Sequence, residues 1–167
     1  PAVAALRAAG IFVVASAGNE GPRCASVSDP IAIYDASFSV GAIDSAGDLA
    51  SFSSRGPVEV DGSDRIKPDI LAPGVDVLSA LPGSSYGANS GTSMAGPHVA
   101  GVVALMWSAQ PALIGQIDRT EQLLTQTARP YAGERGACFD QGVPNNAAGY
   151  GVVDAYAAVQ AALNLGK

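Results

Sequence analysis

Residues 92–107 constrain the fold of this chain more than any other segment. From Val99 to Trp107 the chain reads Val-Ala-Gly-Val-Val-Ala-Leu-Met-Trp. This run is apolar on every side, which predicts a helix that is buried all round in a core. Pro97 fits if the helix begins near Thr92 or Ser93, because an N–H in the first turn has no intrahelical partner to lose. We therefore predict a buried central helix with Ser93 in its first turn.

Ser93 is a candidate nucleophile. The backbone N–H of a residue in the first turn is unpaired and lies near the positive end of the helix dipole, where a developing oxyanion is stabilised. A lone serine at a helix start is usually only a cap. Here the small residues Ala95, Gly96, Ala100 and Gly101 surround it and would let another backbone approach closely. The segment is therefore either a reactive site or a tightly packed, capped helix.

The remaining segments predict an α/β protein with a mostly parallel sheet, because strands are followed by helices. Asp118, with Glu121 three residues later, resembles a capping box for a helix that stops at Pro130. Asp154 is expected to cap a last helix that ends at Gly166, with Tyr156, Val159 and Leu163 on one face. The other expected elements are a helix to Ala9 closed by Gly10, strands at 11–15 and 38–42, extended pieces at 70–72 and 75–79, and a hairpin or exposed loop at 58–67.

Composition excludes some classes of partner. The 167 residues carry a formal net charge of −6 without a Lys/Arg cluster, which argues against nucleic acid. The longest apolar run falls well short of the ~18 residues that a membrane span needs, so no membrane partner is expected. Cys24 and Cys138 lack the spacing of metal ligands and either pair or both stay reduced.

A family resemblance rests on several motifs. The run from Gly91 to Gly101, Gly-Thr-Ser-Met-Ala-Gly-Pro-His-Val-Ala-Gly, closely resembles the nucleophile motif of subtilisin-like serine endopeptidases, the subtilases. The segment 16–21, Ser-Ala-Gly-Asn-Glu-Gly, resembles the part of that family that carries its oxyanion asparagine. Segments 52–57, 72–74 and 81–83 are similar to its connecting loops, and segments 54–57 and 66–69 resemble bacterial bacillopeptidase-F-type members most. The resemblance spans about residues 1–161.

The resemblance implies a three-layer subtilisin-like fold, present in part, and a serine endopeptidase that acts on protein or peptide substrates through an acyl-enzyme on Ser93. The Asn19 side chain and the Ser93 N–H would form the oxyanion hole. This site fits the predicted sheet, because Asn19 follows a buried strand at its carboxyl end, where α/β proteins bind ligands. The other residues that the resemblance places in the substrate site are Ala15, Ser16, Ala17, Gly18, Glu20, Ser28 and Thr92. Asn89 stands where the family often has an aromatic residue.

His98 is the only histidine of the chain, but it is not expected to be the general base. Five residues along a helix place it about 140° around the axis from Ser93 and roughly 7.5 Å along it. In the family this histidine is a packing residue, and a structural role for His98 fits so apolar a helix. The chain thus has a nucleophile and an oxyanion donor, but no base.

The triad order Asp, His, Ser of subtilisin-like enzymes places the other two members before Pro1. We therefore expect residues 1–167 to be the C-terminal portion of a single catalytic domain, with the missing N-terminal portion as its partner and no activity when isolated. The resemblance further implies secretion or a cell-envelope location. No cofactor or metal is expected for catalysis; calcium is a common structural ion of the family, and carbonyls around 29–34 are the candidate ligands.

Two other classes remain as alternatives. A pseudoenzyme would keep the fold for binding while its upstream aspartate and histidine are replaced. A nucleotide-binding α/β protein would need a glycine-rich phosphate loop. Neither Gly-x-Gly-x-x-Gly after a strand nor Gly-x-x-x-x-Gly-Lys occurs in the sequence, which disfavours the second alternative.

Overall fold

The computed structural model describes residues 2–134, 136–139 and 142–165. Its centre is a parallel sheet of β1 (Val14–Ser16), β2 (Phe38–Ile43) and β3 (Ile70–Pro73), in the order β1-β2-β3. The register pairs Val14 with Phe38 and Val40 with Ile70. The predicted α/β class with a parallel sheet is confirmed.

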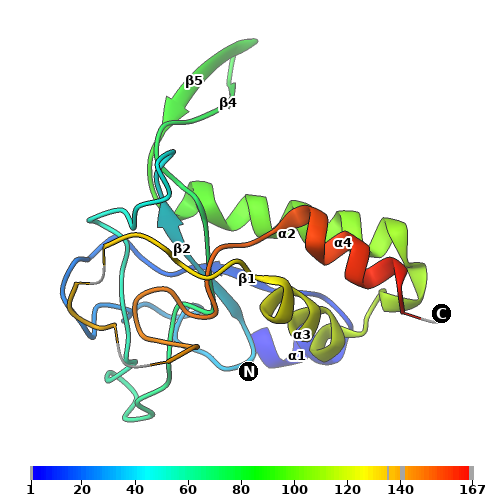
Figure 1. The fold of residues 1–167 in the computed structure, drawn as a ribbon, viewed down its shortest axis with the longest axis horizontal. Coiled ribbons are helices and arrows are strands. Elements are labelled where there is room, and N and C mark those ends of the chain that lie inside the picture. The colour runs from blue at the N-terminus through cyan, green and yellow to red at the C-terminus, as the bar shows by residue number, and fades with distance from the viewer. Residues whose placement is uncertain (1, 135, 140–141, 166–167) are drawn as a thin grey trace.

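Helices cover one face of this sheet (Figure 1). The long helix α2 (Thr92–Ala109) contacts all three strands, and it begins at the predicted position. The short 3-10 helix η1 (Pro111–Leu113) follows, and α3 (Ile117–Thr127) and α4 (Ala155–Leu163) pack against each other, with α4 also against α2. Helix α1 (Ala2–Ala8) precedes the sheet and ends before Gly10, which has the positive φ of 78° that glycine tolerates.

The main core lies between α2 and the sheet. Val99 and Met106 of α2 and Val40 and Ile70 of the strands are completely buried in it. On the opposite face, Leu71 and Ile43 pack with Tyr131, Ala148 and Val152. The strands are apolar on both faces because both faces are covered.

Helix α2 differs from the prediction on one side. Ala100, Gly101, Ala104 and Leu105 are exposed, and Leu105 retains 56% of its accessible surface. The prediction of burial all round is therefore wrong for the described chain. The sheet and α4 contact one side of the helix, so its uniform apolarity is satisfied only there.

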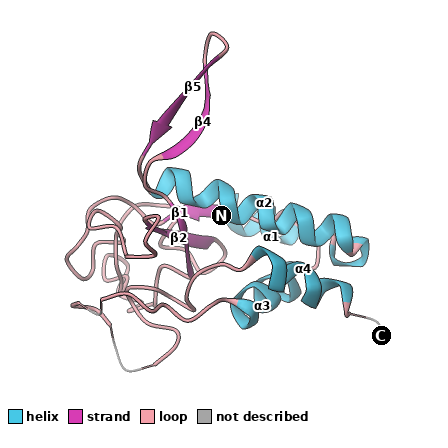
Figure 2. Ribbon diagram, turned by 45° about the horizontal axis from the view of Figure 1, so that its top comes forward, coloured by secondary structure: helices cyan, strands magenta, loops and turns pink. Residues whose placement is uncertain are grey.

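Two strands differ from their predicted extents. The expected strand at 11–15 is reduced to Val14–Ser16, because only these residues pair with β2. The extended piece at 75–79 belongs to β4 (Val77–Leu81), which forms an antiparallel hairpin with β5 (Ser85–Asn89), an element that the sequence analysis missed. The hairpin projects away from the body (Figure 2) and most of its side chains are exposed, so it has no apolar alternation to detect.

The predicted cap at Asp118 is wrong. Helix α3 begins at Ile117, and Gln116 at its N-cap makes no side-chain cap bond. The Asp118 carboxylate instead accepts a hydrogen bond from Arg7 of α1 at 2.6 Å, and Glu121 accepts another at 2.5 Å. The hydrogen bond to Glu121 raises the pKa of Arg7. These charge-assisted bonds join α1 to α3.

The predicted cap at Asp154 is confirmed, since its carboxylate accepts a hydrogen bond from the Ala157 N–H at 2.9 Å. Of the three residues predicted for the apolar face of α4, Val159 is partly buried against the core, whereas the other two are exposed. Ala158 and Ala162 are the buried residues, whereas Tyr156 is 76% exposed and Leu163 41% exposed. Alanines face the core because α4 lies against other helices. The expected stop at Gly166 lies outside the described residues.

Cys24 and Cys138 form a disulfide that joins segments 114 residues apart in sequence. The 58–67 segment turns back on itself through a bridge between Val58 and Arg65, as the predicted hairpin or loop requires. Within the described residues, no helix combines the length and apolarity needed to cross a membrane.

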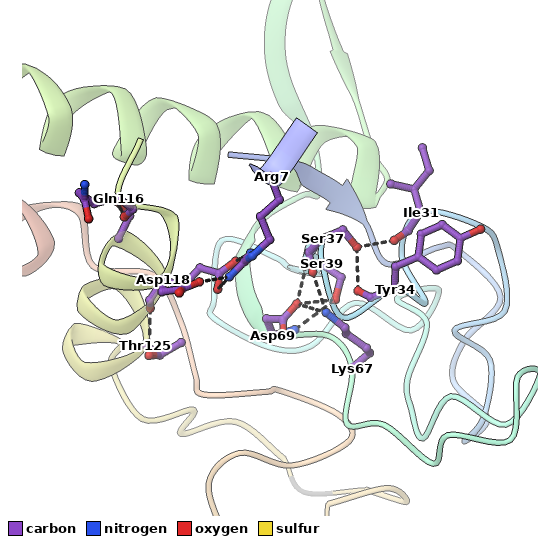
Figure 3. A network of polar contacts seen from close by, with 12 residues as sticks. Arg7, Ile31, Tyr34, Ser37, Ser39, Lys67, Asp69, Gln116, Asp118 and Thr125 are labelled. Carbon is purple, nitrogen blue, oxygen red and sulfur yellow. Dashed lines mark hydrogen bonds and ion pairs between the residues drawn. The ribbon is translucent and has the colours of Figure 1, made fainter. Parts of the chain in front are cut away.

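A partly buried ion pair links the segment that precedes β3 to the start of β2 (Figure 3). The Lys67 Nζ donates to the Asp69 carboxylate at 2.6 Å and to the Ser37 carbonyl at 2.8 Å. The same carboxylate oxygen accepts hydrogen bonds from the N–H and hydroxyl of Ser39, at 2.5 and 2.9 Å. This network fixes the entrance to β3 against the start of β2.

Candidate active site

Ser93 is exposed at the first turn of α2. Gly91, the N-cap residue, has a φ of 154°, a backbone conformation that residues other than glycine rarely adopt. The N–H of Ser93 belongs to the first turn, where the helix supplies no acceptor. Hydroxyl and free donor are thus presented together at the start of a helix whose opposite side is buried.

Asn19 lies directly against this helix start. Its Oδ1 accepts hydrogen bonds from the Thr92 N–H at 2.9 Å and from the Thr92 hydroxyl at 3.1 Å. Because a backbone N–H can only donate, the oxygen of the carboxamide must face Thr92, and the Nδ2 must face away from it. A Cβ built at Gly91 would be 3.6 Å from this Nδ2 and 3.7 Å from the Met94 Sδ. The carboxamide nitrogen therefore lies beside Gly91, two residues before Ser93.

The Asn19 loop has a second anchor in segment 52–54. The Glu20 N–H donates to the Ser54 hydroxyl at 3.0 Å, and the Ser54 N–H donates to the Gly18 carbonyl at 3.0 Å. Gly18 has φ 108°, and a Cβ there would come within 2.8 Å of the Ser54 Oγ. Glycine is thus required at 18 for both conformation and space. These contacts hold the loop from both ends of Asn19.

A hollow of about 310 Å³ adjoins Ser93. It is lined by Val77, Leu78, Ser79, Ser93, Met94, Pro97 and His98. His98 is exposed, and its Nδ1 lies 2.9 Å from the Met94 carbonyl oxygen, to which it donates. His98 therefore does not pack against other residues of the core as expected, because the side of α2 that carries it is uncovered in the described chain.

The predicted substrate-site residues are not alike in their surroundings. Asn19 and Glu20 are exposed, whereas Ser16, Gly18 and Ser28 are partly buried. Ala15 and Ala17 pack in a small separate core with Val27, Ala32, Ile33 and Val58. Their side chains therefore face the interior.

Thr92 is completely buried. Its hydroxyl accepts a hydrogen bond from the Gly18 N–H at 3.2 Å while it donates to Asn19. Thr92 thus orients the asparagine rather than presenting a surface. Sequence reasoning did not find the similar role of Ser54, because a serine before Arg55-Gly56-Pro57 is read as part of a connecting loop.

Three of the carbonyls at 29–34, the candidate calcium ligands, accept hydrogen bonds from side chains of the chain itself. Those of Ile31 and Tyr34 accept hydrogen bonds from the Ser37 hydroxyl, and that of Ile33 accepts one from the Arg65 guanidinium. The Arg65 guanidinium is thus the cation that contacts the Ile33 carbonyl. The described residues also contain no cluster of three or more His, Cys, Asp or Glu side chains placed to hold a metal ion.

Comparison with known proteins agrees with this architecture. Residues 1–151 match the model of the subtilase family, Peptidase_S8. Bacillopeptidase F of Bacillus subtilis (strain 168) is 44% identical over 173 aligned residues, which cover 99% of this chain and 11% of that protein. Subtilisin of Bacillus pumilus is 48% identical over 104 residues, 61% of this chain and 34% of that protein. The chain belongs to the subtilase family.

The fold has a counterpart among solved structures. The prenylagaramide maturation protease PagA superposes with a TM-score of 0.74 at 27% sequence identity. The superposition covers 95% of this chain and 53% of PagA. The chain thus spans about half the length of this structural relative, and 11% and 34% of the two sequence relatives.

Proposed function

We propose that this chain supplies the nucleophile and the oxyanion hole of a serine endopeptidase. The observation that carries the proposal is the double hydrogen bond from Thr92 to the Asn19 Oδ1, at 2.9 and 3.1 Å, directly before Ser93. It orients the carboxamide with its nitrogen available as a donor. Membership of the subtilase family supports the same class of reaction.

In the proposed reaction the Ser93 Oγ attacks the carbonyl carbon of a peptide bond and passes its proton to a general base. The carbonyl oxygen becomes an oxyanion, which accepts hydrogen bonds from the Asn19 Nδ2 and the Ser93 N–H. Collapse expels the amine, which takes up the proton, and leaves an acyl-enzyme that water then hydrolyses. This sequence draws on side chains and backbone and requires no cofactor.

The general base and the aspartate that orients it are proposed to lie on a separate portion of the catalytic domain, before Pro1. The support is that His98 is the chain's single histidine, is five residues from Ser93 on the same helix, and donates its Nδ1–H to Met94. The exposed face of α2 is then where that portion packs. The isolated chain should not hydrolyse peptides measurably, because an oxyanion hole without a base retains little catalysis.

We also propose that the protein acts outside the cytoplasm, in a secreted or cell-envelope location. The disulfide between Cys24 and Cys138 supports this, since disulfides persist in oxidising compartments. The substrates proposed are proteins or peptides, bound where the 15–20 segment and Ser28 approach the site.

The experiment is peptide hydrolysis by the chain expressed together with the region encoded upstream of Pro1. Ser93→Ala should abolish hydrolysis, whereas Ser108→Ala, an exposed serine on the same helix, should leave it unchanged. Asn19→Ala should lower kcat about 10²–10³-fold with little change in KM; that range was measured in subtilisin, a member of this family. Thr92→Val should lower kcat and Thr92→Ser should restore it, because the hydroxyl is the side-chain group of Thr92 that donates to the Asn19 Oδ1.

Two results would contradict the proposal. One is hydrolysis that persists in Ser93→Ala. The other is turnover by the isolated 167-residue chain that depends on Ser93, which would show that the base is within this chain.

A further inference from the structure

Arg55 is a buried cation that is not part of the candidate active site. The residue is 8% exposed. Its backbone is fixed, since its N–H donates to the Ser26 hydroxyl at 2.9 Å and its carbonyl accepts from the Ser26 N–H at 2.8 Å and the Val27 N–H at 3.2 Å. These hydrogen bonds fix the main chain of Arg55 and so place its side chain in the interior.

The guanidinium of Arg55 has few partners for its five N–H donors. Its Nη1 donates to the Ala137 carbonyl at 3.4 Å, which is long for a hydrogen bond. Its Nε is buried and has no hydrogen-bond partner, and none of the ion pairs among the described residues involves Arg55. Burial lowers the pKa of Arg55, because desolvation disfavours its charged form. A buried charge in a folded protein is normally paired.

A cavity of about 320 Å³ lies at this guanidinium. Its lining consists of Arg55, Asp48, Leu49, Tyr131, Glu134 and Gly136. Gly136 borders the guanidinium, since a Cβ built on it would be 3.7 Å from the Arg55 Nη1. The neighbouring disulfide between Cys24 and Cys138 holds the segment that carries Gly136 against the segment before Ser26. The cavity thus has a buried cation and a wall that is covalently held in place.

We propose that Arg55 binds a small organic monocarboxylate in this cavity. A planar carboxylate matches the fork of a guanidinium and supplies the charge and the acceptors that Arg55 lacks. Leu49 and Tyr131 also line the cavity, where the organic part of the ligand would lie.

The two acidic residues of the lining set the selectivity. Asp48 and Glu134 line the same cavity and repel any additional negative charge. A monoanion pairs with Arg55 and keeps its apolar end toward the rest of the wall, whereas the second charge of sulfate or phosphate would face these carboxylates. The site should therefore prefer propionate to sulfate. This inference does not depend on peptidase activity.

The test is binding of propionate to the purified chain at pH 7, followed by thermal unfolding and by saturation-transfer NMR of the propionate protons. Sodium chloride keeps the ionic strength constant. Propionate should raise Tm in a saturable way, as a ligand of the folded state does. Sulfate at the same ionic strength should give no saturable rise.

Three variants locate the site. Arg55→Lys keeps a positive charge but loses the fork, and should weaken propionate binding roughly tenfold. Glu134→Gln removes repulsion and should strengthen binding, by roughly threefold. Arg129→Lys, a matched change at an arginine whose side chain is 67% exposed, should leave binding unchanged.

Equal propionate binding by Arg55→Lys and the unaltered chain would overturn the proposal, as would an equal response to sulfate. If Arg55→Lys does not fold, Glu134→Gln decides alone. Unchanged or weaker propionate binding by Glu134→Gln would then show that the ligand does not lie in this cavity.

Discussion

Replacing Lys67 by methionine tests whether the buried ion pair fixes β2 and β3 together. The substitution keeps a long unbranched side chain but removes the Nζ bonds to the Asp69 carboxylate, at 2.6 Å, and to the Ser37 carbonyl, at 2.8 Å. Removing one partner of a buried ion pair lowers the free energy of unfolding by roughly 3–5 kcal/mol. The Asp69 side chain is 21% exposed, and in the variant it would still accept the hydrogen bonds from Ser39. We therefore expect the lower end, a loss of about 3 kcal/mol.

The measurement is urea unfolding of the purified chain at pH 7. With a slope of about 2 kcal/mol per molar urea, the midpoint should fall by about 1.5 M. Arg23→Met, at an exposed arginine, is the matched control and should change the free energy of unfolding by less than about 0.5 kcal/mol.

A double-mutant cycle separates the ion pair from simple packing. Asp69→Asn in the Lys67→Met background removes the carboxylate that the first change leaves unpaired. The double variant should therefore be more stable than the sum of the two single effects predicts, by about 1–2 kcal/mol. Additive effects, or a loss below about 1 kcal/mol for Lys67→Met, would refute the reasoning.

Three further predictions concern other parts of the chain. Cys24→Ser should lower the free energy of unfolding by about 4 kcal/mol, because the disulfide joins residues 114 positions apart. If reduction of the unaltered chain leaves its urea midpoint where it was with the disulfide intact, the prediction is contradicted. Asp154→Ala should cost about 1 kcal/mol in the same assay through loss of the cap on α4, and Asp154→Asn should recover most of it. Hydrogen peroxide should oxidise Met94, which is partly exposed, before the fully buried Met106; peptide mass spectrometry that finds the opposite order would sink the idea.

The sequence predicted the elements in which local pattern and tertiary environment agree. The start of α2 at Thr92 and the cap at Asp154 depend on the chemistry of a few adjacent residues, and both are found. Strand β2 was also predicted, at 38–42, and it spans Phe38–Ile43 with every residue buried.

Local pattern failed where a distant segment competes. Asp118 has the sequence of a cap but bonds to Arg7, a residue 111 positions away. Tyr156 and Leu163 have helical spacing, yet the small Ala158 and Ala162 face the neighbouring helices. The β4–β5 hairpin is held by backbone pairing, which leaves little trace in its mostly exposed side chains.

The sequence by itself determined the family, the α/β class and the placement of Ser93 at a helix start, since these depend on motifs and on apolar runs within one segment. Only the tertiary structure decided that Thr92 and Ser54 orient the Asn19 loop, that Lys67 pairs with Asp69 beside Ser37, and that Arg55 is buried without an ion pair among the described residues. Each of these facts is a contact between segments, and its energy depends on distance and burial. Neither quantity is encoded in the order of neighbouring residues.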